Sequence, residues 1–305
     1  MSELFRFAFR RYSRSFKYPM ITHHGEWHIR EGIILELTNE AGQVGMGEIA
    51  PISWFGSETL EAALEFCQQL PRKINRETIY QIPEHLVACR FGFGSALEQI
   101  TTPYSSQPVS LKYTALLPAS KISLKVWRDL WENGYETFKW KMGVQSLEEE
   151  IEIFLRLANE IPPSIKLRLD ANGGLTVEEA KIWLQVCEKI PQVEFLEQPL
   201  PQEKFEDMVK LSETASLPIA LDESVATIPQ LKATYGQGWR GIFVIKPAIM
   251  GFPSELRQFC LEKSLDLVFS SAFETEVGRV FLLKLAGELQ SPGRAVGLSL
   301  HNQFA

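Results

Sequence analysis

The sequence predicts an α/β fold, a modified (β/α)7β barrel with an N-terminal α+β capping domain. From Val109 onward, short apolar segments alternate with amphipathic helical segments at roughly 25 residues per unit, which is the pattern of a β/α barrel. Upstream, strand-like and helix-like segments occur without this alternation. No GxGxxG follows an early strand, so the glycine fingerprint of a dinucleotide-binding fold is missing. We therefore predict a capping domain over 1–107, completed by the C-terminal tail, and a barrel domain over 108–300.

The capping domain is predicted to begin with a strand. Phe5, Phe7 and Phe9 alternate with smaller or charged residues, which is the period of a half-buried strand and favours a strand over an Arg-rich transit peptide. Ile33–Leu37 and Val44–Ile49 flank a short polar turn, so we expect an antiparallel hairpin. The helices predicted for this domain cover 58–70 and 95–100.

The barrel domain contains eight predicted strands with helices between them. One helix begins near Ser123 and stops at Asn133–Gly134, and the next follows Ser146, with acids in its first turn where the helix dipole favours them. The predicted strands are 109–113, 137–142, 166–170, 193–197, 219–222, 242–246, 267–270 and 295–298.

The composition excludes several classes of function. A net charge of −7 argues against a broad basic surface for nucleic acid. No apolar run approaches the ~20 residues that a membrane span needs. The four cysteines form no CxxC pair, which indicates reduced thiols in a cytoplasmic protein.

Acidic residues end three consecutive predicted strands of the barrel, at Asp170, Glu197 and Asp222. Catalytic groups of barrels lie at the C-terminal ends of the strands, and neighbouring ends are about 5 Å apart. Three close carboxylates repel one another unless a cation neutralises them, and oxygen ligands suit Mg²⁺, with Mn²⁺ as an alternative. Asp170 or Asp222 alone would be interpreted as a loop residue or helix cap. Their repetition at matched positions predicts a metal site.

Lysines end the second and sixth predicted strands. Lys139 and Lys141 are two residues apart and share one strand face, while Phe138 and Trp140 face the helices. Two ammonium groups inside a barrel need anions nearby. At ~7 Å and an effective dielectric constant near 20, one lysine opposes the charge of the other by roughly 2 kcal/mol, which lowers a lysine pKa toward the range of a general base. Lys246 is expected across the barrel from this pair, although alone it would read equally well as a surface lysine.

Other polar residues near the strand ends are candidates for substrate binding. Arg168 lies two residues before the first predicted metal ligand, on the same strand face, and could orient a carboxylate. Ser270 and Ser271 could donate hydrogen bonds to a substrate carboxylate, or serve only in a turn. We interpret Glu223 and Glu274 as supporting or surface acids without a direct role.

This set of residues resembles the muconate lactonizing enzyme subgroup of the enolase superfamily. The resemblance covers essentially the whole chain and rests on the lysine pair, the Asp/Glu/Asp set on the next three strands and the lysine on the sixth. Within the subgroup, the short length, GMGEIAPI at 45–52, Arg168 and SSAFET at 270–275 resemble the o-succinylbenzoate synthase family. The resemblance implies that Asp170, Glu197 and Asp222 bind Mg²⁺, that Lys141 is the base, that Lys246 steadies an enolate from the opposite face and that Lys139 is an electrostatic partner. It also implies a lid, which we place at 18–30 and 51–57.

The reaction implied by this resemblance is the dehydration of 2-succinyl-6-hydroxy-2,4-cyclohexadiene-1-carboxylate to 2-succinylbenzoate in menaquinone or phylloquinone biosynthesis. The expected partner is thus a small carboxylate substrate, without nucleic acid or membrane. The oligomeric state stays open, with a monomer favoured over larger assemblies.

Several alternatives share much of this pattern. Dipeptide epimerases have the same lysines and metal ligands but usually carry Asp-x-Asp at the end of the eighth strand, where this chain reads AVGLSLHN. N-succinylamino acid racemases and cycloisomerases of the same superfamily remain open, because fold and superfamily do not determine the substrate. A non-catalytic barrel would be expected to lack at least one ligand or lysine, and none is missing.

Overall fold

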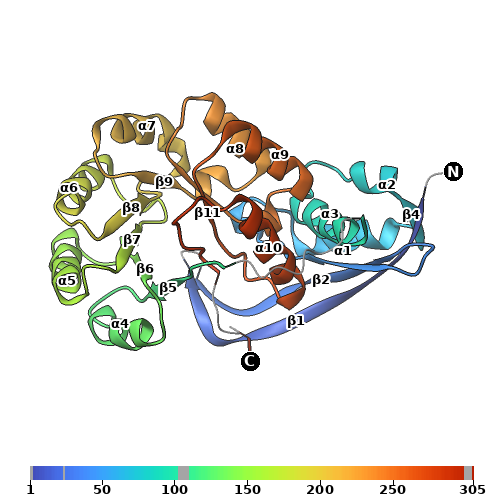
Figure 1. Ribbon diagram of the computed structural model, residues 1–305, viewed down its shortest axis with the longest axis horizontal. Coiled ribbons are helices and arrows are strands. Elements are labelled where there is room, and N and C mark those ends of the chain that lie inside the picture. The colour runs from blue at the N-terminus through green and yellow to red at the C-terminus, as the bar shows by residue number, and fades with distance from the viewer. Residues whose placement is uncertain (1–2, 23–24, 102–109, 299–303) are drawn as a thin grey trace.

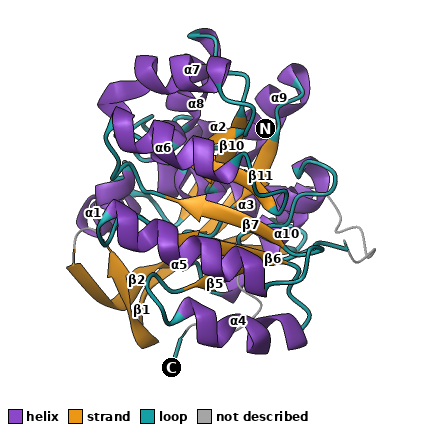
Figure 2. Ribbon diagram, turned by 90° about the vertical axis from the view of Figure 1, so that its left-hand side faces the viewer, coloured by secondary structure: helices purple, strands orange, loops and turns teal. Residues whose placement is uncertain are grey.

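The computed structural model describes residues 3–22, 25–101, 110–298 and 304–305. An antiparallel sheet in the order β3-β2-β1-β4 forms the core of the cap, and a seven-stranded parallel sheet in the order β11 to β5 forms the barrel wall. Figure 1 shows the cap, in blue and cyan, beside the barrel, in green to red. Figure 2 shows helices packed outside the barrel strands. The predicted fold class, a barrel domain with an N-terminal cap, is confirmed.

The cap follows the predicted strand order closely. The alternating phenylalanines lie in β1, and the predicted hairpin is formed by β2 and β3, paired from Ile33 with Ile49 to Thr38 with Val44. The predicted first helix is α1. The bounds of the cap elements are β1 Leu4–Thr22, β2 Gly25–Thr38, β3 Val44–Ile49, η1 Ser53–Phe55, α1 Leu60–Gln69, β4 Lys73–Asn75, α2 Arg76–Tyr80 and α3 Val87–Thr101.

Helix α3 begins eight residues before the predicted 95–100 segment, and glycines explain the difference. Glycine is unfavourable inside a helix, so Gly92 and Gly94 hid the first half of α3 from a propensity argument. Here the glycines allow α3 to approach β3. A Cβ on Gly47 would lie 1.9 Å from the carbonyl oxygen of Gly92, and a Cβ on Gly92 would lie 2.7 Å from Ile49.

The second to seventh predicted barrel strands are confirmed, each within one residue. The first is wrong: β5 begins at Thr114, because its register with β6 pairs Thr114 with Thr137, whereas Leu111 and Tyr113 lie before it. The barrel elements are β5 Thr114–Leu117, α4 Ser123–Glu132, β6 Thr137–Lys141, α5 Leu147–Glu160, β7 Lys166–Asp170, α6 Val177–Cys187, β8 Val193–Glu197, η2 Gln202–Lys204, α7 Phe205–Thr214, β9 Ile219–Leu221, η3 Glu223–Val225, α8 Ile228–Gly236, β10 Ile242–Ile245, η4 Pro247–Ile249, α9 Pro253–Lys263, β11 Leu267–Phe269 and α10 Glu276–Leu289.

The eighth predicted strand is reduced to two isolated bridges. Val296 pairs with Tyr113 on one side, and Gly297 pairs with Ser270 on the other. This segment therefore closes the sheet between its two edge strands. Close to the C-terminus, Phe304 forms an antiparallel bridge with Phe16 of β1. The predicted domain boundary lies within 102–109, outside the described residues, so the division into domains stays a prediction.

A buried glutamate of the cap holds the last helix of the barrel. Glu48, on β3, is fully buried and accepts hydrogen bonds from the Tyr12 hydroxyl at 2.6 Å and from the backbone N–H groups of Thr275 and Gly278 at 2.8 and 2.9 Å. A carboxylate at a helix N-terminus is favoured by charge-assisted hydrogen bonds and by the helix dipole. Glu48 thus fixes α10 relative to the cap.

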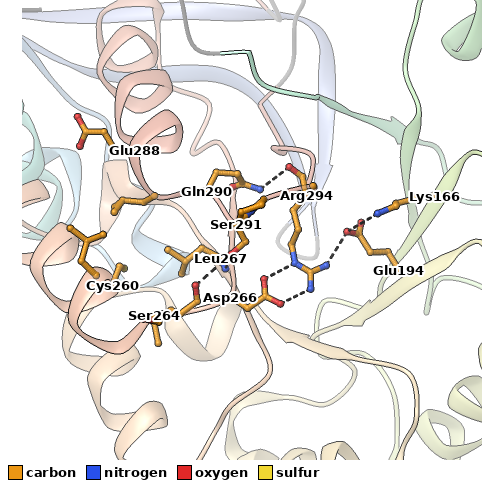
Figure 3. A pocket seen from close by; sticks show the side chains of 15 residues that line it. Lys166, Glu194, Cys260, Ser264, Asp266, Leu267, Glu288, Gln290, Ser291 and Arg294 are labelled. Atoms are coloured by element: carbon orange, nitrogen blue, oxygen red, sulfur yellow. Dashed lines mark hydrogen bonds and ion pairs between the residues drawn. The ribbon is translucent and has the colours of Figure 1, made fainter. Parts of the chain in front are cut away.

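Charged side chains fill the end of the barrel where the strands begin (Figure 3). Arg294 donates to the two carboxylate oxygens of Asp266 at 2.6 and 2.5 Å and to Glu194 at 2.9 Å, and Arg168 donates to Glu194 at 2.6 Å. A cavity of about 660 Å³ adjoins this cluster. Because its charged groups are paired with one another, we interpret the cluster as a structural closure of the barrel. Arg294 immediately precedes the segment that completes the barrel, and its ion pairs hold it in place.

Replacing Arg294 with methionine is expected to lower the free energy of unfolding by about 3 kcal/mol, the lower end for a broken buried ion pair. The loss comes mainly from Glu194, whose side chain is 6% exposed and would keep its charge with one strong partner fewer. Urea denaturation measures this difference. The matched control is Arg156→Met, which breaks an exposed pair with Glu160 and is expected to leave the stability almost unchanged. Equal effects of the two substitutions would contradict the closure.

Among the residues that the structure describes, none of the helices has the length and apolar character that crossing a bilayer demands.

Candidate active site

A cleft of about 500 Å³ lies at the C-terminal ends of the barrel strands, under the cap. The structure brings all of the predicted site residues to this one cleft. Side chains of the cap and further barrel residues form the rest of its wall. The predicted residues that line it are Lys139, Lys141, Arg168, Asp170, Glu197, Asp222, Lys246, Ser270 and Ser271, and the lining residues of the cap are Met20, Trp27, Ile52, Trp54 and Phe55.

Lys139 lies between two of the predicted metal ligands. Its Nζ is 2.9 Å from Asp170 Oδ2 and 2.6 Å from Glu197 Oε1. Strand register produces this arrangement, because Asp170 pairs with Glu197 on adjacent strands and Lys139 enters from the next strand. Burial opposes the charge of Lys139, but Asp170 and Glu197 outweigh it and raise its pKa. The lowering of a lysine pKa that the sequence suggested is therefore wrong for Lys139.

The carboxylates of Asp170 and Glu197 compete for this one ammonium group. Burial opposes ionisation of Asp170, but Lys139 outweighs it, and the pKa of Asp170 is lowered. Burial and the charge of Asp170 raise the pKa of Glu197 to about 8. The charge of Lys139 alone therefore does not neutralise both carboxylates.

Lys141 and Lys246 enter the cleft from strands four positions apart in the sheet. Among the described residues, the side chain of Lys141 forms no ion pair or hydrogen bond. Lys246 pairs with Asp222, and its Nζ lies 4.0 Å from the centroid of the Phe55 ring, a cation–π contact with the cap. Phe138 and Trp140 pack into the core on the outer face of β6, as the alternation predicted. Lys141 is therefore the candidate for the base, because no described side chain engages its amine. The amine of Lys246 is held in place by Asp222.

The acids suit a divalent cation by their chemistry. Asp170, Glu197 and Asp222 are at most 3% exposed, and all offer oxygen donors, the ligands that Mg²⁺ prefers. Within the described part of the chain, no three His, Cys, Asp or Glu side chains already converge on one ion position. Instead, Lys139 and Lys246 lie against the acids. The raised pKa of Glu197 and a partnerless buried oxygen of Glu223 indicate a site that can take more positive charge.

Glu223 and Asn172 line the cleft beside the acids, and the sequence analysis gave neither a direct role. The Asn172 backbone N–H donates to Asp170 Oδ1 at 3.1 Å, and its side-chain amide donates to Glu223 Oε1 at 3.0 Å. Asn172 adopts a left-handed conformation with φ of 45°, which asparagine tolerates better than most residues. Their position in the sequence could have indicated both residues, because each follows a predicted metal ligand within two residues.

Gln198 is another residue that sequence reasoning missed. It is fully buried, and its side-chain oxygen accepts from the backbone N–H groups of Asp222 and Ser224 at 2.9 and 3.2 Å. Its amide donates to the Ser224 hydroxyl at 2.8 Å. Gln198 therefore holds the start of the turn that carries Asp222.

The three predicted substrate-binding residues differ in what they have left to offer. Arg168 is 1% exposed and binds Glu194, Thr114 and the Ala295 carbonyl, which leaves its Nη2 without a partner among the described residues. The Ser271 hydroxyl donates to Glu274 at 2.9 Å and accepts from a backbone N–H, so it serves turn chemistry here. Ser270 makes no side-chain hydrogen bond in the described structure.

The cap closes the cleft with aromatic side chains. The rings of Trp54 and Phe273 lie 5.0 and 5.5 Å from Trp27, centroid to centroid. Behind these rings, Arg30 joins the cap segment that carries Trp54 to the barrel loop that carries Phe273. It donates to the carbonyl of Pro51 at 2.9 Å and to that of Phe273 at 3.1 Å. The predicted lid segment 18–30 forms the end of the β1–β2 hairpin. Its residues 23–24 lie outside the described residues.

Comparison with known proteins shows the family of this chain. Residues 124–261 match the family model described as enolase C-terminal domain-like, and residues 5–100 match the MenC N-terminal domain. An o-succinylbenzoate synthase from Thermosynechococcus vestitus is 40% identical over 97% of this chain and 92% of its own length. One from Yersinia enterocolitica is 28% identical over 94% of this chain and 88% of its length.

Solved structures agree. The crystal structure of o-succinylbenzoate synthase from Thermosynechococcus elongatus BP-1, with magnesium in its active site, matches with a TM-score of 0.89 at 40% identity, over 96% of this chain and 92% of that one. The L-Ala-D/L-Glu epimerase of Bacillus subtilis matches with a TM-score of 0.80 at 18% identity, over 94% and 87%. At that identity the likeness shows the fold alone.

The capped barrel and its charged cleft are those of an enzyme of the enolase superfamily. Within this superfamily the chain belongs to the o-succinylbenzoate synthase family, a family of hydro-lyases.

Proposed function

We propose that the chain catalyses the Mg²⁺-dependent dehydration of 2-succinyl-6-hydroxy-2,4-cyclohexadiene-1-carboxylate to 2-succinylbenzoate, in menaquinone or phylloquinone biosynthesis. The observation that carries this proposal is 40% identity to an o-succinylbenzoate synthase over nearly the whole chain. The cleft supports it, because the acids and lysines that this chemistry needs line the same space.

Asp170, Glu197 and Asp222 would hold the Mg²⁺, with Mn²⁺ as a possible substitute. When bound, the ion supplies positive charge at the substrate carboxylate, where negative charge develops as the α-proton leaves. Lys141 takes that proton, since it is the cleft lysine without a partner in the described structure. Lys246 faces the developing charge from the opposite side, and Lys139 stays protonated and orients the two acids that it contacts.

The second step returns the proton. Lys141, now an ammonium group, gives the proton to the departing hydroxyl group, which leaves as water, and the ring becomes aromatic. One residue can act as base and then as acid when both groups lie on one face of the substrate. Aromatisation favours this step, so the enzyme chiefly has to stabilise the first one.

Substrate contacts are assigned to Arg168, Ser270 and Ser271. Within the described structure, the Ser270 hydroxyl at the cleft makes no hydrogen bond, and the Nη2 amino group of Arg168 has both of its N–H donors free. Ser271 would have to exchange its hydrogen bond to Glu274 for one to the substrate. We further propose a cytoplasmic monomer.

The test is the loss of ultraviolet absorbance of the cyclohexadiene substrate with purified protein and Mg²⁺, repeated after chelation. N-succinylamino acids and dipeptides are assayed in parallel, because lysines on two sides of a substrate can also move a proton between faces. Rapid metal-dependent loss of the diene is expected. If well-folded, metal-loaded protein leaves the diene untouched but racemises N-succinylamino acids or dipeptides, the substrate assignment is wrong.

A further inference from the structure

Glu223 carries a carboxylate oxygen that has no partner among the residues that the structure describes. It follows Asp222 directly, at the start of η3, and lines the cleft. Its Oε2 is buried and forms no hydrogen bond within the described residues. Buried polar atoms are nearly always hydrogen-bonded, so this exception calls for a partner beyond the described residues.

The other oxygen of Glu223 holds the turn that carries a proposed metal ligand. Oε1 accepts from the Asn172 side chain at 3.0 Å, and the Asn172 backbone N–H donates to Asp170 Oδ1 at 3.1 Å. Glu223 is therefore attached to Asp222 through the chain and to Asp170 through Asn172. Two of the three proposed ligands depend on its position.

We propose that Glu223 is the outer-sphere acid of the metal centre: Oε1 fixes the Asp170 turn through Asn172, and Oε2 accepts a hydrogen bond from a water bound to the ion. This inference rests on the proposed function, because it needs the metal at Asp170, Glu197 and Asp222. Mg²⁺ usually keeps several waters, and each needs an acceptor in a site as buried as this one. Outer-shell partners orient ligands and set metal affinity.

The competing explanation is a purely structural hydrogen bond to Asn172. That bond uses Oε1 alone and leaves Oε2 buried without a partner in the described part of the chain. Glu223→Gln separates the two roles, since glutamine keeps a carbonyl oxygen for Asn172 but replaces the second acceptor with an amide donor. A donor cannot accept a hydrogen bond from a metal-bound water.

The experiment is a titration of substrate-free protein with Mg²⁺ by calorimetry and with Mn²⁺ by electron paramagnetic resonance. We expect Glu223→Gln to weaken metal binding by about 10- to 100-fold. The melting temperature in EDTA reports separately on folding. The matched control is Glu58→Gln, a buried cap acid that accepts from the backbone N–H groups of Ala88 and Cys89 and should leave metal affinity unchanged.

Two further variants keep the result decisive. If Glu223→Gln fails to fold, Asn172→Gly takes its place, because glycine accepts the left-handed backbone and removes only the amide that anchors Glu223. Weaker metal binding in that variant supports the inference. Asp222→Asn is the reference: if it loses the metal while Glu223→Gln and Asn172→Gly bind as the parent does, the outer-sphere role is wrong and the centre stands. If Asp222→Asn also binds normally, the centre itself is wrong.

Discussion

Replacing Lys141 with alanine is expected to lower kcat by on the order of 10⁴-fold, the upper range for loss of a general acid–base group. Lys141 would serve in both proton transfers, and the other cleft lysines are engaged, Lys139 with Asp170 and Glu197, and Lys246 with Asp222. Neither can replace it without giving up an ion pair. The measurement is the ultraviolet assay under single-turnover conditions, which separates chemistry from product release.

Lys166→Ala is the control for this substitution. Lys166 lies at the start of β7, at the opposite end of the barrel, with a side chain that is 52% exposed. We expect its kcat to match the parent. Lys141→Ala should still bind Mg²⁺, because the Lys141 side chain makes no ion pair with the acids and acts on Asp170 only through its charge. A variant that keeps a tenth of the parent kcat would show that another group is the base.

Local patterns in the sequence were sufficient to predict the strands and the direction of their side chains. On β6 the alternation of Lys139 and Lys141 with Phe138 and Trp140 separates cleft from core, because a strand has a period of two. The recurrence of charged strand ends in successive units then placed the acids and lysines together, since parallel strands end at one face of a barrel.

Features that depend on long-range contacts escaped prediction. The first half of α3 is visible only once β3 lies against Gly92. The eighth strand is just two bridges, and one of its partners, Tyr113, lies at the other edge of the sheet and far away in sequence. The pKa of Lys139 is raised because strand register places two carboxylates on it, and a lysine pair considered alone suggests the opposite direction.

Two supporting residues of the site were missed for a related reason. Gln198 and Asn172 lie in turns where their φ angles are 37° and 45°, and side-chain type alone does not predict such turns. Glu223 was interpreted as a supporting or surface acid without a direct role. Only the structure shows that one of its oxygens is buried without a partner.

Replacing Glu197 with glutamine is expected to lower Mg²⁺-dependent kcat by about 10³-fold, comparable to the several kcal/mol that a metal ion contributes to charge stabilisation. Glutamine preserves the shape and can still accept from Lys139, so the substitution tests the charge of the ligand alone. EDTA treatment of the parent should give a similar loss, which excess Mg²⁺ reverses in the parent but not in the variant. Full activity of Glu197→Gln at saturating Mg²⁺ would exclude Glu197 as a ligand.

The same substitution is expected to change how the stability of the metal-free protein depends on pH. Burial and Asp170 raise the pKa of Glu197 from 4.5 to about 8, so the folded state favours the protonated acid. The unfolded chain releases that proton near pH 4.5, and the folded protein therefore loses stability as the pH rises from about 4.5 to about 8. In EDTA, urea denaturation should show this decline in the parent and a smaller one in Glu197→Gln, which has no proton to lose. Bound Mg²⁺ should suppress the decline in the parent, because a cation favours the carboxylate form. A decline of equal size in the parent and the variant would mean that another buried acid carries the raised pKa.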